Sequence, residues 1–187
     1  MASGSSDHTI RIFQPHNNFK CILTLEEHTY SVNTLIQLSD GRLASGSKDD
    51  SIIVWNTNEV FKVTHRLKGH TSGVIIISQI EDGRLTSGSL DQTIRIWNTQ
   101  DDFKCSLTIS GHVGYFWSLL QLNDGRLASS SYDSTIRIWD TKKNFEFRSI
   151  LHGHTNSVNC LIQLNDGRIA SGSYDKSIRI WKVNKFN

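Results

Sequence analysis

The sequence predicts an all-β fold built from repeated, four-stranded antiparallel sheets. One observation is an uninterrupted repeat, because an aromatic residue returns every 42 positions, at Phe13, Trp55, Trp97, Trp139 and Trp181. A second is that each unit holds four short runs of β-branched and aliphatic residues separated by turn residues, with no helical periodicity. Four short strands in a unit of this length are typical of the blade of a β-propeller.

The first two strands of each unit are expected to form a hairpin. Residues 32–38 are rich in β-branched and aliphatic side chains, Asp40-Gly41 follows them, and residues 42–47 form the next run. Asp-Gly between two apolar runs predicts a type I′ turn, in which both central residues have positive φ. The same pair recurs in the later units at Asp82-Gly83, Asp124-Gly125 and Asp166-Gly167.

The third and fourth strands follow a tight turn at residues 48–50. We expect the third at residues 51–55 and, after a looser link, the fourth at residues 63–67. The period divides a single segment, residues 1–187, into a partial blade and four repeats. These are residues 1–27, 28–69, 70–111, 112–153 and 154–187.

Several features recur together at fixed spacing: Gly-His, then Ser-Gly-Ser, then Asp, then Ile-x-Ile-Trp. In one unit they are Gly69-His70, Ser87-Gly88-Ser89, Asp91 and Ile94 to Trp97. This combination covers nearly the whole chain and resembles the WD-repeat propeller family. The chain departs from the pattern in three ways: only Trp139-Asp140 is a literal Trp-Asp pair, Glu27-His28 replaces Gly-His, and Phe13 replaces Trp. The resemblance implies about four and a half propeller blades.

The repeats are too few for the seven-bladed ring that is common in this family. Met1 occupies the position of Leu43 one unit later, so the first unit is expected to lack its innermost strand. The last unit, which reaches its aromatic residue at Trp181, is expected to lack its outer strand. Three interpretations stay open: a piece of a longer propeller protein, half of an eight-bladed ring closed by a second copy, or a small ring closed by one chain.

Histidine, serine and aspartate in every unit raise the question of catalysis. A catalytic triad is assembled once, around one activated nucleophile. The resemblance instead implies a structural hydrogen-bonded chain in each blade, in which the serine is Ser87 or Ser89 in one unit; spacing does not decide between them. The other members of these chains are His28, Asp49 and Trp55; His70, Asp91 and Trp97; His112, Asp133 and Trp139; and His154, Asp175 and Trp181. We therefore expect no catalytic residue and no enzyme.

In the family that the chain resembles, partners often dock beside the link into the first strand and the turn before the third. The matching positions are Ser31, Asn33 and Lys48; Gly73, Ile75 and Leu90; Tyr115, Trp117 and Tyr132; and Ser157, Asn159 and Tyr174. Aromatic residues on a polar rim are frequent in binding hot spots. We expect a partner to contact Tyr115, Trp117, Tyr132, Tyr174, Leu90, Ile75 and Lys48. For Trp117, packing between blades is an equal alternative.

These features predict a non-enzymatic scaffold that binds a protein or peptide, with a second copy of the chain as a further partner. The alternative is a regulatory or sensor module that binds a small ligand in the propeller channel. Charged residues make up 20% of the chain and leave a net charge of +2 without a basic block, so nucleic acid is not expected. No long apolar run predicts a membrane segment, and no motif predicts a metal or cofactor site.

The three cysteines indicate the compartment. They are odd in number and far apart, at Cys21, Cys105 and Cys160. We expect Cys21 and Cys105, which lie in two copies of the phrase Phe-Lys-Cys, to be small buried side chains, and the compartment to be reducing and cytoplasmic.

Overall fold

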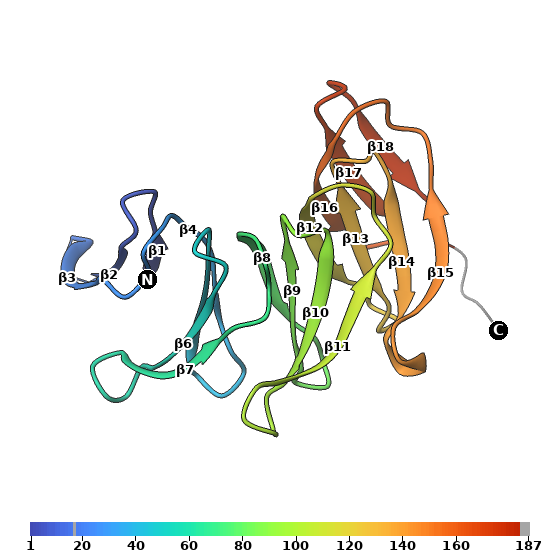
Figure 1. Ribbon diagram of the computed structural model, residues 1–187. Coiled ribbons are helices and arrows are strands. Elements are labelled where there is room, and N and C mark those ends of the chain that lie inside the picture. Colours follow the sequence, from blue (N-terminus) through green and yellow to red (C-terminus); the bar gives the residue numbers. More distant parts are fainter. Residues whose placement is uncertain (17, 184–187) are drawn as a thin grey trace.

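The computed structural model describes residues 1–16 and 18–183, and it confirms the all-β prediction. Its strands form five antiparallel sheets, here called blades 1 to 5, which follow one another in chain order across Figure 1. Blade 1 consists of β1 (Ala2–Gly4), β2 (Ile10–Gln14) and β3 (Lys20–Leu25). Blade 5 consists of β16 (Val158–Gln163), β17 (Ile169–Ser173) and β18 (Ile178–Trp181).

The three inner blades have four strands each, paired in sequence order. Blade 2 consists of β4 (Val32–Gln37), β5 (Leu43–Ser47), β6 (Ile52–Asn56) and β7 (Lys62–Leu67). Blade 3 consists of β8 (Val74–Gln79), β9 (Leu85–Ser89), β10 (Thr93–Asn98) and β11 (Lys104–Ser110). Blade 4 consists of β12 (Phe116–Gln121), β13 (Leu127–Ser131), β14 (Ile136–Asp140) and β15 (Glu146–Leu151), with a short 3-10 helix η1 (Thr141–Lys143) after β14.

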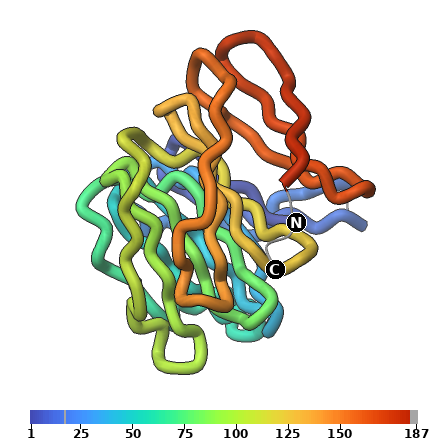
Figure 2. Tube along the Cα trace, turned by 90° about the vertical axis from the view of Figure 1, so that its right-hand side faces the viewer, coloured from blue at the N-terminus to red at the C-terminus, as the bar shows by residue number. Residues whose placement is uncertain are grey.

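The row of blades is an open arc. Blades 1 and 5 lie at its opposite ends in Figure 1, and Figure 2 views the same row with the orange and red strands in front and the blue strands of blade 1 behind. The chain therefore forms a partial propeller.

The Asp-Gly hairpins differ from the predicted type I′ turn. Leu38 N–H donates to the carbonyl of Arg42 at 2.8 Å, and Gly41 N–H donates back to the carbonyl of Leu38 at 2.9 Å. Gly41 has a φ of 89°, whereas Asp40 is not among the residues with positive φ. This is a three-residue loop that ends in a left-handed glycine. Asp40 has another role, because its carboxylate accepts the N–H of Arg42 at 3.0 Å.

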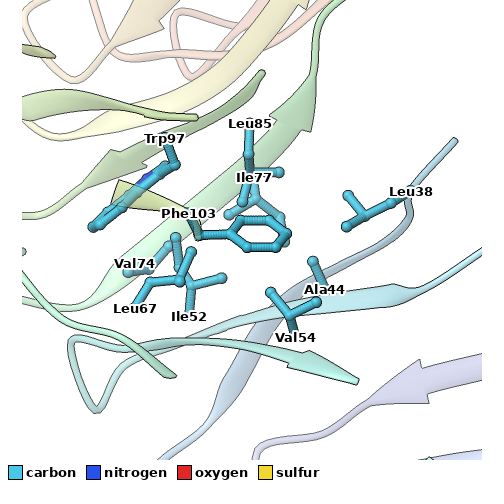
Figure 3. Close-up of a cluster of buried hydrophobic side chains, with 10 residues drawn as sticks. All are labelled: Leu38, Ala44, Ile52, Val54, Leu67, Val74, Ile77, Leu85, Trp97 and Phe103. Atoms are coloured by element: carbon cyan, nitrogen blue, oxygen red, sulfur yellow. The ribbon is translucent and has the colours of Figure 1, made fainter. Parts of the chain in front are cut away.

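The hydrophobic core lies between successive blades. Figure 3 shows side chains of blades 2 and 3 pointing toward one another, with the Phe103 ring between them. Leu38 belongs to this core, and Ile80 and Leu122 occupy the equivalent position in the next two blades. Each of the three is at most 3% exposed. Burying a side chain of this size stabilises the fold by about 1.5–3 kcal/mol. Each inner blade is therefore held by the apolar faces of its neighbours.

A repeated glutamine also joins neighbouring blades by hydrogen bonds. Gln79 Oε1 accepts the N–H of Ser39 from the preceding blade at 2.7 Å, and its Nε2 donates to the carbonyl of Gly83 in its own blade at 2.9 Å. Gln121 and Gln163 bond Glu81 and Asn123 in the same way, at 2.8 and 2.7 Å. These bonds fix the Asp-Gly end of each blade to the next.

The prediction that Cys21 and Cys105 are buried is wrong, since all three cysteines are exposed free thiols. Cys21 and Cys105 lie on β3 and β11, the outermost strands of their blades, which have a neighbouring strand on one side only. Their small size therefore does not place them in the core. Among the residues that the structure describes, no helix is long and apolar enough to span a bilayer.

Candidate partner-binding face

Blades 2 to 5 each contain one hydrogen-bonded chain of four side chains. In blade 3, Trp97 Nε1 donates to Ser87 Oγ at 2.9 Å, Ser87 Oγ lies 2.7 Å from His70 Nε2, and His70 Nδ1 lies 2.7 Å from Asp91 Oδ2. The same three contacts are 2.7–2.9 Å in the other blades. Their members are His28, Ser45, Asp49 and Trp55; His112, Ser129, Asp133 and Trp139; and His154, Ser171, Asp175 and Trp181.

The partners of each group set the direction of these bonds. Asp91 Oδ2 also accepts the N–H of Thr71 at 3.0 Å, so it acts as an acceptor toward His70. The histidine therefore carries its proton on Nδ1, and its Nε2 accepts the hydroxyl proton of Ser87. The Ser87 oxygen in turn accepts the indole N–H. Each of these four side chains thus has a hydrogen-bond partner for its buried polar atoms.

The structure decides between the two serines, because Ser87 joins the chain and Ser89 does not. Ser89 Oγ donates to the carbonyl of Ser72 at 2.7 Å and accepts the N–H of Asp91 at 3.0 Å. The sequence reasoning missed one more member, Thr93, whose hydroxyl donates to Asp91 Oδ1 at 2.7 Å. The sequence does show a serine or threonine two residues after each of these aspartates. Asp side chains often accept hydrogen bonds from the residue two positions later, so this spacing could have identified the hydroxyl.

Burial and hydrogen bonding shift the pKa values of these groups. Burial alone would raise the pKa of Asp49, but hydrogen bonds from Ser51, the N–H of Thr29 and His28 lower it to about 2. Burial lowers the pKa of His28, against the opposing effect of Asp49. Both shifts favour a neutral histidine beside an ionised carboxylate.

The order Ser–His–Asp matches that of a hydrolase triad, but the serine is inaccessible. Ser45, Ser87 and Ser129 have no exposed surface, and Ser171 is 1% exposed. Each serine oxygen is already bonded to an indole as well as to the imidazole. A nucleophile must reach its substrate, so this geometry suits a structural role.

The expected contact positions meet at one end of each blade. A backbone hydrogen bond joins the two segments that carry them: Lys48 to Ser31, Leu90 to Gly73, Tyr132 to Tyr115, and Tyr174 to Ser157, at 2.9–3.0 Å. Neighbouring blades are also in contact here, because a Cβ on Gly73 would lie 3.1 Å from the Cα of Lys48. The positions therefore form one surface, here called the aromatic rim.

Tyrosines dominate the exposed part of this rim. Tyr115 is 42% exposed, Tyr132 58% and Tyr174 62%. The rings of Tyr115 and Tyr132 lie 6.0 Å apart between centroids. Leu90 and Ile75 are half-buried, and Lys48 is exposed.

Trp117 differs from the tyrosines. It is half-buried and occupies a β-bulge, where the pairing of β12 with β13 skips one residue between Phe116 and Ser118. Its Nε1 is buried without a hydrogen-bond partner among the described residues. The equivalent Asn33 in blade 2 donates to the carbonyl of Val74 in the next blade at 2.8 Å.

The family described as WD domain, G-beta repeat matches the chain four times, over residues 19–56, 61–98, 103–140 and 145–182. The chain belongs to the WD-repeat family. Comparison with curated proteins gives no significant match.

Each WD repeat of the family is offset from the blades. The match over residues 19–56 joins β3, the outer strand of blade 1, to the three inner strands of blade 2. Every WD repeat therefore spans a junction between two blades and includes residues from both sides of it. WD repeats generally mediate interactions between proteins, and proteins built from them are typically non-enzymatic scaffolds.

One further residue of the rim was missed by the sequence reasoning. Tyr30 is 53% exposed, the ammonium of Lys48 lies 5.8 Å from its ring centre, and the His8 ring lies 5.5 Å from it. Its signal was an aromatic residue one position before Ser31, which matches a docking position of the family. The rim thus carries exposed tyrosines on blades 2, 4 and 5.

Proposed function

We propose that this WD-repeat chain is a non-enzymatic scaffold that binds a protein or peptide on the aromatic rim. The observation that carries the proposal is the exposure of Tyr115, Tyr132 and Tyr174 at one end of neighbouring blades 4 and 5. Large aromatic side chains supply contact area at a low cost in conformational entropy, and tyrosine adds a hydroxyl for hydrogen bonding. Leu90, Ile75 and Lys48 extend the same surface over blades 2 and 3.

Trp117 supports this surface from beneath in our proposal. The side chain at the equivalent position in blade 2, Asn33, reaches the backbone of the next blade. Trp117 is larger and half-buried, and it lies two residues from Tyr115. We assign Tyr132 and Tyr174 to direct contact with the partner, and Trp117 to packing between blades 4 and 5.

The charge of the rim favours a neutral partner segment. Lys48 and Lys176 are exposed, and Asp50 is half-buried, so the turns of the rim carry both signs in small number. The oxygens of the aspartates in the hydrogen-bonded chains, such as Asp91, already accept hydrogen bonds from their own blade. We therefore favour a peptide that docks through apolar and aromatic side chains over an anionic polymer.

The exposed thiols support a reducing, cytoplasmic location. Cys21, Cys105 and Cys160 are free, and thiols of this kind persist where the environment keeps them reduced. No metal or cofactor is required by the proposal.

The test is selection of binders from a displayed library of random twelve-residue peptides. We expect peptides that bind the wild-type chain and compete with one another, and that perturb amide resonances around Tyr115, Tyr132 and Tyr174. The Ile22→Ala variant is the control and should bind the same peptides as the wild type, because Ile22 is 55% exposed on the outer strand β3, away from the rim. Peptides that perturb only the strands facing the channel would support a ligand site in the channel and overturn the proposal.

A further inference from the structure

The carboxylates at the rim end of blades 4 and 5 are fully hydrogen-bonded within their own blades. Asp133 accepts four hydrogen bonds at 2.6–3.1 Å, from His112, the N–H of Val113, and the N–H and hydroxyl of Thr135. Asp175 accepts four bonds from the equivalent groups of blade 5, also at 2.6–3.1 Å. A carboxylate accepts about four hydrogen bonds, so neither group has capacity left for an N–H of a partner.

Three buried side-chain atoms of the same rim make no hydrogen bond to any described residue. One is the Oγ of Ser157, a residue that is 0% exposed, and another is Trp117 Nε1. The third is Asn159 Oδ1, and a half-turn of this amide exchanges the acceptor for its Nδ2 donors. The rim between blades 4 and 5 thus has unpaired donors, and a partner there must supply acceptors.

The repeat places the unpaired serine between two exposed tyrosines. A Cβ on Gly73, the counterpart of Ser157 in blade 3, would lie 3.1 Å from the Cα of Lys48, at the position of Tyr132, and 3.4 Å from the leucine at the position of Tyr174. The N–H of Tyr174 also donates to the carbonyl of Ser157 at 3.0 Å. Both tyrosines are more than half exposed, and exposed side chains change rotamer within nanoseconds, so the rings can turn and open the serine hydroxyl to a ligand.

We propose that the partner segment is rich in proline and binds in the polyproline II conformation, with proline rings against Tyr132 and Tyr174. Proline offers a carbonyl acceptor without an N–H donor, and polyproline II makes no internal hydrogen bonds, so its carbonyls are available to Ser157 Oγ and Trp117 Nε1. Surfaces lined by aromatic side chains recognise this conformation in other proteins. The inference rests on the proposed function and names the class of partner.

Two other classes of segment complement this part of the rim less well. An extended peptide of ordinary composition brings an N–H at every residue, and burying such a group without an acceptor is costly. An acidic segment brings acceptors, but it would face the ionised carboxylates of Asp133 and Asp175 between the tyrosines. The exposed cations Lys48 and Lys176 are too few to offset this repulsion along the rim.

The test is an NMR titration of the full, isotope-labelled chain with decaproline, acetylated and amidated at its ends. Decaproline should shift the amide resonances of Tyr132, Ser157 and Tyr174 and the indole resonance of Trp117, all with one saturating Kd. A glycine-serine decapeptide and decaglutamate, blocked in the same way, should leave these resonances in place. Decaproline that shifts none of them overturns the proposal, and so does a tighter Kd for decaglutamate.

Two substitutions test the unpaired donors. Ser157→Ala leaves no buried group unpaired, so the variant should fold like the wild type and bind decaproline about fivefold more weakly, the worth of one neutral hydrogen bond. Trp117→Phe keeps an aromatic ring and removes the N–H, and a loss of about fivefold is expected again. Ser31→Ala, at the equivalent position of blade 2, is the matched control and should keep the wild-type Kd. An unchanged Kd for both Ser157→Ala and Trp117→Phe overturns the proposal.

The failure of this inference can be distinguished from the failure of the proposed function. Peptides selected from the random library that shift Tyr132 and Tyr174 but contain no proline would overturn the inference and leave binding at the rim intact. A library that yields no peptide perturbing the rim would overturn the proposed function and this inference with it.

Discussion

Two adjacent serines on β13 provide a matched test of the hydrogen-bonded chain. Ser129 and Ser130 are both 0% exposed. Ser129 Oγ accepts the indole N–H of Trp139 at 2.8 Å and lies 2.9 Å from His112 Nε2. Ser130 Oγ has no partner among the described residues. Replacing each by alanine makes the same chemical change at neighbouring, equally buried positions.

The expected magnitudes differ because the two hydroxyls have different partners. Ser129→Ala leaves the Trp139 N–H and His112 Nε2 unpaired in the core. An unpaired buried polar group costs about 1–3 kcal/mol, and we expect the free energy of unfolding to fall by about 2–4 kcal/mol. Ser130→Ala removes a hydroxyl that makes no hydrogen bond, so we expect a change within about 0.5 kcal/mol or a gain in stability.

The assay is urea denaturation of both variants and the wild type, followed by tryptophan fluorescence and circular dichroism. A lower midpoint with an unchanged dependence on urea measures a loss of stability. Equal losses for Ser129→Ala and Ser130→Ala would mean that any cavity on β13 costs the same. A Ser129→Ala variant as stable as the wild type would refute the structural role of the chain.

Three further predictions concern the titration, the turns and the core. The carboxyl of Asp49 should titrate near pH 2 by NMR in the folded chain. Because this pKa is lowered, the stability that the ionised carboxylate contributes, at most about 2.5 kcal/mol, is complete above about pH 5 and should be lost as the pH falls through 2; a midpoint near 3.9 would contradict this. Gly41→Ala should lower the free energy of unfolding by about 1–2 kcal/mol, because Gly41 has a φ of 89°. A Cβ there meets nothing within 4 Å, so the loss would come from backbone strain alone, and an unchanged thermal or urea midpoint would refute that argument. Ile94→Ala should cost about 2–5 kcal/mol at a fully buried position, whereas Ile178→Ala, at an exposed one, should cost far less; similar losses would contradict the described burial.

The blades could be predicted because local signals and the repeat agree. Strand β6 (Ile52–Asn56) lies within one residue of its predicted bounds, and β5 (Leu43–Ser47) begins one residue late. The type of turn at Asp40-Gly41 was harder to predict from the sequence. Asp-Gly also suits a three-residue loop, in which Gly41 alone needs positive φ and Asp40 bonds the N–H of Arg42. Sequence spacing does not distinguish the two loops.

The side-chain environments were only partly predictable. Spacing left Ser87 and Ser89 equivalent, because residues two apart on a strand point to the same face. The bond from Trp97 Nε1 to Ser87 Oγ separates them, and it depends on how β9 and β10 pair. The exposure of Cys105 depends on its place in an outermost strand, which small side-chain size does not reveal. The tyrosines of the aromatic rim could be picked out from the sequence, because positions that break a regular repeat are visible there.

The most direct test of partner binding on the aromatic rim compares two affinities of one selected peptide. One is its affinity for the wild-type chain, and the other is its affinity for a Tyr132→Ala, Tyr174→Ala double variant. Hot-spot side chains contribute about 2 kcal/mol or more each, so two additive losses weaken the Kd about 800-fold, and titration calorimetry should show at least the thirtyfold loss of a single one. The thermal midpoint of the variant should match the wild type, because both tyrosines are more than half exposed. An unchanged Kd, or a loss of binding that accompanies an equal loss of stability, would contradict a binding role for the aromatic rim.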